Sequence, residues 1–246
     1  AAGRAALDEA AASAGRAARH ITVAPCMQLM VGDDPAALLQ LLKFGVAVYY
    51  GPDSSPYARA ANELGYRDEV AEVQALIDAV AKKHKGLRAI IHNASDWLPD
   101  NADHPPEEIL QRMMDVHVAA PYRITLGLAG LLKADAPADI VHIGDYVSGR
   151  GSKKHVAYAA SKAAQDNLTL SFAALLAPAV KVNSVAPALV LFNEDDSSEY
   201  REKTLRKSLL QREGGLDEMQ HQVDYLLDSN YVTGRIIHMD GGRHLA

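Results

Sequence analysis

The chain has 246 residues and a net charge of −6, from 25 Lys and Arg against 31 Asp and Glu. Hydrophobic residues make up 48% and charged residues 23%, a globular balance that excludes a mostly disordered chain. The acidic balance argues against nucleic acid as the main partner. A single cysteine, Cys26, excludes an intrachain disulfide and a cysteine-based metal cluster.

The N-terminal residues 1–19 are rich in Ala and poor in large apolar side chains, so they can bury little surface. We expect them to form a flexible extension and residues 20–246 to form a single domain. No apolar run approaches the roughly 18 residues that a membrane span needs. The sequence therefore predicts a soluble cytoplasmic protein with no membrane partner.

From residue 20 onward, short apolar runs alternate with longer helical patterns. The predicted strands are 20–24, 46–50, 87–92, 139–143, 180–186 and 235–239. The predicted helices are 35–43, 68–83, 107–132, 158–176 and 216–227, and residues 188–215 are expected to be an irregular, partly helical insertion. This alternation predicts an α/β fold, a Rossmann-like doubly wound parallel sheet with helices on both faces.

In such sheets, ligands bind beyond the C-terminal ends of the strands. Asp145 follows one predicted strand there. Tyr158 and Lys162 are four residues apart on the next helix, so they share one face. An ammonium group beside the phenol would favour the tyrosinate and lower the phenol pKa, which suits a general acid. The pattern predicts proton-transfer chemistry at this edge of the sheet.

These features together resemble the short-chain dehydrogenase/reductase family. Four motifs carry the resemblance: Tyr158-x-x-x-Lys162, Asn93-Ala94-Ser95, the run from Val182 to Pro187, and Thr233-Gly234 followed by Asp240-Gly241-Gly242. The resemblance covers residues 86–246 well and residues 20–85 poorly.

The residue thirteen positions before the tyrosine narrows the resemblance. Most family members have a serine there, whereas this chain has Asp145. An Asp-Tyr-Lys set is typical of the pteridine reductases, and residues 188–194 and 241–245 are also similar to that group. An aromatic residue two positions after Asn-Ala-Ser, here Trp97, is a further similarity.

The resemblance implies hydride transfer from NADPH to a dihydropterin, such as dihydromonapterin or dihydrofolate. In that interpretation Asp145 and Tyr158 supply or relay the proton and Lys162 holds the nicotinamide ribose. Ser95 orients the pterin and Trp97 stacks on it, where aromatic stacking adds about 1 kcal/mol. The cofactor would also contact Gly32, Asn93, Ala94, Ser95, Tyr158, Pro187, Ala188 and Leu189. The family further implies a homotetramer.

The first third of the chain departs from the family pattern. Residues 24–32 stand where the family has the Gly-rich turn that approaches the pyrophosphate, but of its glycines only Gly32 is present, and Pro25 removes a backbone donor. Gly51 stands where an Arg suited to the 2′-phosphate is expected, and His117 replaces the usual Asn of the fourth helix. Three explanations stay open: an altered loop that binds NADPH, loss of tight cofactor binding, or an N-terminal sequence that differs from the natural one.

Other functions and plainer roles remain possible at this point. The chain could reduce another carbonyl or imine, or be a non-catalytic relative. Asp145 could be a helix cap, and Trp97 could pack on the core. His92, His142 and His238 lie in predicted strands and are expected to be packed, and no metal site is predicted.

Overall fold

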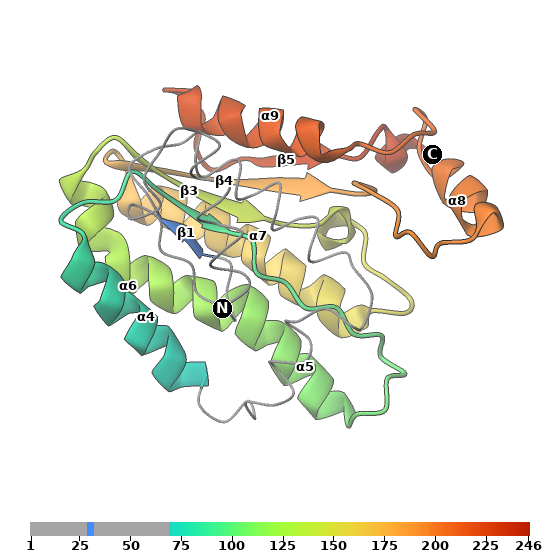
Figure 1. Ribbon diagram of the computed structural model, residues 1–246, viewed down its shortest axis with the longest axis horizontal. Coiled ribbons are helices and arrows are strands. Elements are labelled where there is room, and N and C mark those ends of the chain that lie inside the picture. The colour runs from blue at the N-terminus through green and yellow to red at the C-terminus, as the bar shows by residue number, and fades with distance from the viewer. Residues whose placement is uncertain (1–28, 32–68) are drawn as a thin grey trace.

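The computed structural model describes residues 29–31 and 69–246. Within these residues, one sheet has its strands in sequence order across its width (Figure 1). The strands are β1 (Leu29–Val31), β2 (Ala89–His92), β3 (Ala138–Ile143), β4 (Val180–Pro187) and β5 (Ile236–Met239). Every residue of β2 and β3 is buried, as expected for strands covered on both faces.

Strands β2 to β5 are parallel, which confirms the predicted α/β class. Strand β1 differs, because it pairs antiparallel with β2. We expected residues 29–31 in the cofactor turn beside Gly32. Their sequence, Leu-Met-Val, is apolar and suits a strand, and it covers an edge of β2. The predicted strands 20–24 and 46–50 and the helix 35–43 lie outside the described residues.

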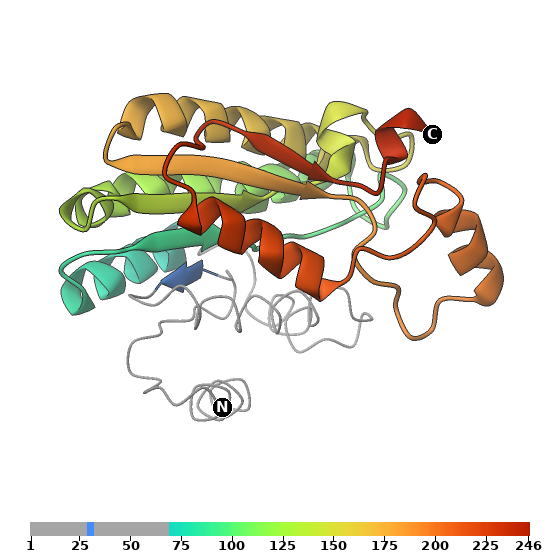
Figure 2. The same ribbon diagram turned by 90° about the horizontal axis from the view of Figure 1, so that it is seen from above.

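Helices cover both faces of the sheet, as predicted. Figure 1 shows α9 on one face and α4, α6 and α7 on the other, and Figure 2 shows these three side by side. None of the described helices is long and apolar enough to cross a bilayer. The helical segments are α4 (Glu69–Lys83), α5 (Pro106–Met114), η3 (Asp115–Ala119), α6 (Ala120–Ala134), η4 (Tyr146–Gly149), α7 (Val156–Leu176), α8 (Ser198–Leu205), α9 (Leu216–Asp228) and η5 (Arg243–Leu245).

The predicted helix 107–132 is broken by η3, a π-helical turn between α5 and α6. Pro121 explains the break, since it has no N–H to donate to the carbonyl of His117 four residues earlier. The wider turn brings His117 to a fully buried position. Turns of this kind often mark functional sites, because they re-aim a side chain within a helix.

The core has a separate apolar layer on each face of the sheet. Ile90 and Ile140 pack toward α4, α6 and α7, while Ile91 and Val141 pack toward α9. Gly127 of α6 lies so close to α4 that an added Cβ would be 2.8 Å from the Ile77 side chain. These layers hold the strand ends in place.

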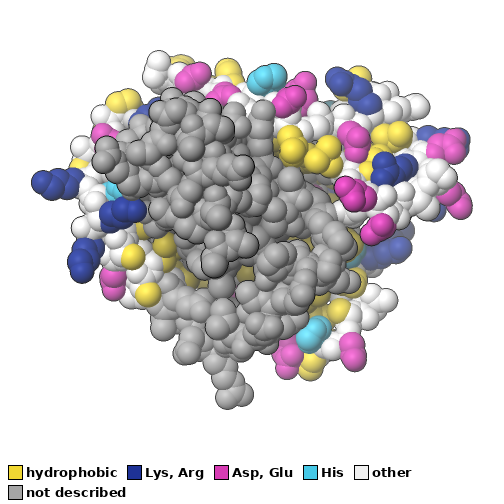
Figure 3. Space-filling view, viewed as in Figure 1, with side chains coloured by type: hydrophobic (Ala, Val, Ile, Leu, Met, Phe, Trp, Pro, Cys, Tyr) yellow, Lys and Arg dark blue, Asp and Glu magenta, His cyan; other side chains and the backbone are white. Residues whose placement is uncertain are grey.

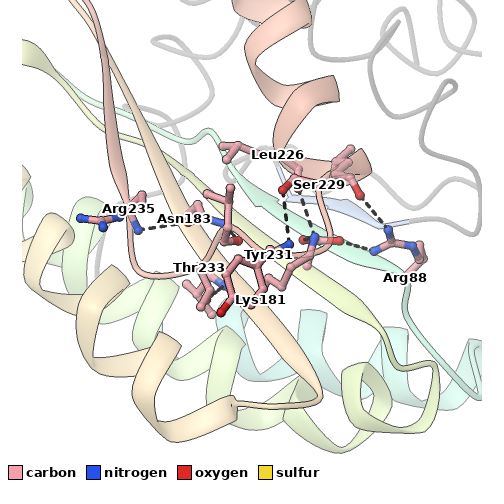
Figure 4. Close-up of polar contacts among 12 residues, drawn as sticks. Arg88, Lys181, Asn183, Leu226, Ser229, Tyr231, Thr233 and Arg235 are labelled. Carbon is pink, nitrogen blue, oxygen red and sulfur yellow. Dashed lines mark hydrogen bonds and ion pairs between the residues drawn. The ribbon is translucent and has the colours of Figure 1, made fainter.

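A charged cluster lies at the end of the sheet where strand β3 begins. The buried Asp139 accepts hydrogen bonds from Arg88 and Lys181, which also donate to the Leu227 and Leu226 carbonyls of α9 (Figure 4). The cluster therefore ties β2, β3, β4 and α9 together.

Nearby, Asn183 links β4 to the chain that leads into β5. Its side chain donates to the Val232 carbonyl at 2.9 Å and accepts from the Arg235 N–H at 3.0 Å (Figure 4). The Thr233 hydroxyl accepts from the N–H of Val182 at 3.1 Å. The family motifs at residues 182–187 and 233–234 thus have a structural role here, joining the last two strands.

We expect Asp139→Asn to lower the free energy of unfolding by roughly 3 kcal/mol, because two cations lose their buried carboxylate. Asp139 is 1% exposed, while the exposed pair Arg206–Glu202 is a matched control. Urea denaturation should show less than about 1 kcal/mol for Glu202→Gln. Equal effects of the two variants would contradict this role of Asp139.

Candidate active site

Helix α7 and the end of β3 bring Asp145, Tyr158 and Lys162 together. The Tyr158 hydroxyl donates to Asp145 Oδ2 at 2.7 Å. Lys162 lies one helical turn further along, with its Nζ 5.8 Å from the centroid of the Tyr158 ring. Gly144, directly before Asp145, packs closely against β4, where an added Cβ would lie 2.8 Å from Ser184 Oγ. The three predicted catalytic side chains therefore occupy one site.

Asp145 has two roles at once. Its Oδ1 accepts from the N–H of Val147 at 2.8 Å and so caps η4, while Oδ2 accepts from Tyr158. Burial raises the pKa of the Asp145 carboxyl, and the Val147 N–H, Tyr158, Lys162 and Arg243 oppose that rise. A carboxyl with a raised pKa holds its proton closer to neutral pH than an ordinary aspartate does.

Lys162 is a buried cation, only 1% exposed. Burial lowers its pKa to about 8, and the nearby carboxylates of Asp145 and Asp166 partly oppose this. Its Nζ donates to the Ile143 carbonyl at 2.9 Å and to Gln165 Oε1 at 3.4 Å. An ammonium group has three N–H donors, so one remains for a ligand.

His117 connects the loop after β2 to α7. Its Nε2 accepts from the Asp96 N–H at 3.3 Å and lies 2.9 Å from Ser95 Oγ. Its Nδ1 lies 2.8 Å from Ser161 Oγ, which donates to the Tyr158 carbonyl at 2.8 Å. The His117 ring also meets the Tyr158 ring edge-on, with 5.4 Å between centroids.

These contacts define the state of the His117 ring. Because Nε2 accepts from a backbone N–H, the proton sits on Nδ1 and is donated to Ser161. Burial lowers the pKa of His117 well below its usual range, and Lys162 lowers it further. A neutral imidazole therefore fixes both Ser95 and Ser161 of α7, and His117 acts as a positioning residue.

Trp97 lies in the loop after β2, against the start of the helix α7 that carries Tyr158, and is 60% exposed. One face of its ring stacks on His155, with 4.2 Å between ring centroids, and His155 Nδ1 contacts the Leu98 carbonyl. The core-packing alternative is therefore wrong for this side chain. The high exposure leaves ring surface for a flat ligand.

The predicted cofactor residues of the described chain follow β2 and β4, the two neighbours of β3. Asn93 is buried at the end of β2, followed by the partly buried Ala94. Pro187 ends β4, the Ala188 N–H donates to the Met239 carbonyl, and the Leu189 carbonyl accepts from Gly214. Gly32 lies outside the described residues.

Sequence reasoning missed two residues of the site. His155 stands three positions before Tyr158, but nothing in its pattern indicated stacking on Trp97. Arg243 acts on Asp145 from the far end of the chain. Only its place after a strand end, next to the Asp240-Gly241-Gly242 motif, could have indicated it.

Comparisons with known proteins agree with this geometry. A family model described as enoyl-(acyl carrier protein) reductase matches residues 68–244. The chain belongs to the short-chain dehydrogenase/reductase family of oxidoreductases. It is also 53% identical over 175 residues to the dihydromonapterin reductase of Escherichia coli K12, which covers 70% of this chain and 73% of that protein.

Solved structures show the same fold. An alternative dihydrofolate reductase 1 (FolM) from Brucella canis, complexed with NADP, has a TM-score of 0.64 at 29% identity. The likeness covers 73% of this chain and 72% of that one. A putative short-chain dehydrogenase/reductase from Burkholderia xenovorans has a TM-score of 0.64 at 25% identity over 83% and 92% of the two chains.

The buried charge of Lys162 should lower the free energy of unfolding in a way that depends on pH. Its pKa is about 8 in the folded protein and 10.5 in an unfolded chain, so between these pH values the unfolded state binds more protons. The free energy of unfolding of the wild type, relative to Lys162→Met, should therefore rise by up to about 1.4 kcal/mol per pH unit in that window.

Urea denaturation at several pH values measures this difference. Below pH 8 the difference should be flat, and a flat difference up to pH 10.5 would contradict the buried-charge assignment. The exposed Lys85→Met variant is the control and should run parallel to the wild type.

Proposed function

We propose that this protein reduces a dihydropterin to its tetrahydro form with NADPH, by hydride transfer and proton delivery. The observation that carries the proposal is the Asp145–Tyr158 hydrogen bond of 2.7 Å, with the Lys162 ammonium group behind it. An Asp-Tyr-Lys set suits protonation of a ring nitrogen. The identity with dihydromonapterin reductase and the likeness to the NADP-bound dihydrofolate reductase support the same chemistry.

The hydrogen-bond donors of the site fit a nicotinamide cofactor. The free N–H of the Lys162 ammonium and the Tyr158 hydroxyl are groups that bind ribose hydroxyls. Asn93 to Ser95 and Pro187 to Leu189 flank the end of β3 and would hold the nicotinamide end. When bound, the cofactor supplies the hydride.

The protein's own side chains move the proton. Tyr158 and Asp145 share one proton-bearing hydrogen bond. The proton goes from this pair to the ring nitrogen of the substrate, and solvent returns it after the reaction. Lys162 keeps its positive charge near both groups, which favours loss of the proton from Tyr158.

We also propose a homotetramer. Helices α6 and α7 present large apolar side chains to solvent, and these would pack against a second copy. They are Tyr122, Leu126, Leu170 and Leu175. Light scattering of the purified protein measures the mass directly.

Removing either member of the acid pair should abolish most activity. We expect Tyr158→Phe to lower kcat/KM for dihydromonapterin by about 10²- to 10⁴-fold, since general acid catalysis contributes that much. Asp145→Ser should lose pterin reduction to a similar extent. Oxidation of NADPH, followed at 340 nm, measures both.

Tyr225→Phe, an exposed position on α9, is the matched control and should keep wild-type turnover. Retained pterin reduction in Asp145→Ser would favour an ordinary carbonyl reductase. Folded wild-type protein that binds neither NADPH nor NADH would overturn the proposal and favour a non-catalytic relative.

Trp97 is the one tryptophan of the chain, so its fluorescence reports directly on a ligand that stacks on it. We expect a bound pterin to quench this fluorescence, because its ring stacks on the exposed indole. Trp97→Ala should raise KM for the pterin by about threefold to tenfold with little change in kcat. A pterin that is reduced without quenching Trp97, and with wild-type KM in the variant, would exclude stacking.

A further inference from the structure

Five cationic side chains lie near one another on the Asp145–Tyr146 side of the candidate active site. They are Arg150, Lys154, Lys203, Lys207 and Arg243, and we call them the cationic rim. The group is notable because the chain as a whole carries a net charge of −6. It comes from four separate parts of the chain: η4, the approach to α7, the α8 region and η5.

The two arginines are held on Tyr146, the residue directly after Asp145. The Cζ atoms of Arg150 and Arg243 lie 5.7 Å and 5.0 Å from the centroid of the Tyr146 ring. Arg150 Nη1 also donates to the Tyr146 hydroxyl at 2.5 Å and to the Arg243 carbonyl at 3.3 Å. The ring that holds both guanidinium groups therefore belongs to the residue next in sequence to Asp145, the carboxyl of the proposed proton-donating pair.

The lysines extend the rim toward Trp97. Lys154 directly precedes His155, on which Trp97 stacks, and its carbonyl accepts from the Asp100 N–H at 3.0 Å. Lys207 lies just after α8, in a loop whose Leu210 N–H donates at 3.0 Å to the carbonyl of Gly241, in the turn before η5. The pKa of Lys207 is lowered, first by partial burial and then by the charges of Arg243, Lys203 and Lys154. These four cations therefore interact electrostatically.

No described carboxylate forms an ion pair with any member of the rim. Other cations of the described residues do have such partners, as in Arg88–Asp139, Arg112–Asp96 and Arg206–Glu202. Figure 3 shows acidic and basic side chains mixed over the α8 end of the molecule, so this is not a broadly basic face. Like charges that lie close together repel one another, and an anionic ligand would relieve that repulsion.

We propose that the cationic rim binds an anionic group, a carboxylate or a phosphate, on the side chain of the pterin substrate. This inference rests on the proposed function, because it places the pterin ring between Asp145 and Trp97. A ring held there has Arg243 on the Asp145 side and Lys154 on the Trp97 side. A charged substituent leaving the site between them meets cations on both sides.

Steady-state kinetics with three substrates test the proposal. They are dihydrofolate with its two carboxylates, a phosphate ester of a dihydropterin, and uncharged dihydromonapterin. In the double variant Lys154→Gln/Lys207→Gln we expect kcat/KM for at least one anionic substrate to fall by about tenfold, through KM. The value for dihydromonapterin should stay within about twofold, and the arm that responds identifies the anion as carboxylate or phosphate.

Salt and a distant lysine provide the controls. Raising the ionic strength should weaken binding of the anionic substrate in the wild type and much less in the double variant. Lys85 lies before β2, at the opposite end of the strands from the site. Lys85→Gln should therefore leave kcat/KM unchanged for all three substrates. Equal kcat/KM ratios for charged and uncharged substrates in wild type and double variant would overturn the anion subsite.

Failure of the proposed function gives a different result. A folded wild type that reduces none of the three substrates overturns pterin reduction. Quenching of Trp97 fluorescence by dihydrofolate, the phosphate ester and dihydromonapterin then tests the rim without turnover. Tighter binding of an anionic ligand, lost in the double variant, supports the subsite, and no such preference overturns it.

Discussion

The burial of one positive charge, that of Lys162, governs the arrangement of the candidate site. A buried ammonium group is costly unless polar atoms surround it, so its position fixes those atoms. The Ile143 carbonyl, the last of β3, accepts from it, and Gly144 then bonds to the Val185 carbonyl at 2.8 Å. The chain then leaves the sheet, and Asp145 caps the start of η4. The burial of this cation beside Asp145 and Tyr158 reduces stability, a compromise that is common where enzymes place charge in an active site.

Neutral histidines allow a polar layer to extend behind this cation. His92 and His142 lie opposite each other on β2 and β3, with stacked rings 5.0 Å apart. Burial lowers the pKa of His92 to about 3 and that of His142 well below its usual range. His142 donates to Thr169, which donates to the Gln165 carbonyl, and Gln165 in turn contacts Lys162. A second cation so close to Lys162 would be unfavourable, so the burial of these rings keeps the site's charge on one residue.

The sequence allowed the sheet from β2 to β5, its helices and the Asp145–Tyr158–Lys162 group to be predicted, because periodicity and spacing along one or two elements determine them. Contacts that join distant segments were not predictable in this way. The π-helical turn that buries His117 depends on Pro121 and on the packing of α5 against α7. The Trp97–His155 stack and the approach of Arg243 to Tyr146 depend on tertiary structure alone. The antiparallel β1 was missed because the family pattern places a turn at residues 29–31.

The aspartate at position 145 suits protonation of a ring nitrogen better than protonation of a carbonyl oxygen. Reduction of a ketone produces an alkoxide, which is basic enough to take a proton from a phenol with a pKa near 10. Serine then needs only to orient the oxygen. The imine nitrogen of a dihydropterin has to be protonated before the hydride arrives, and at that stage it is a far weaker base than an alkoxide, so a phenol alone is a poor donor to it. A carboxyl whose pKa is raised by burial is a stronger acid than the phenol yet holds its proton nearer neutral pH than an exposed aspartate. The 2.7 Å bond to Tyr158 joins this acid to a hydroxyl that can pass the proton on, which is why the pair, and not either residue alone, is expected to determine the substrate class.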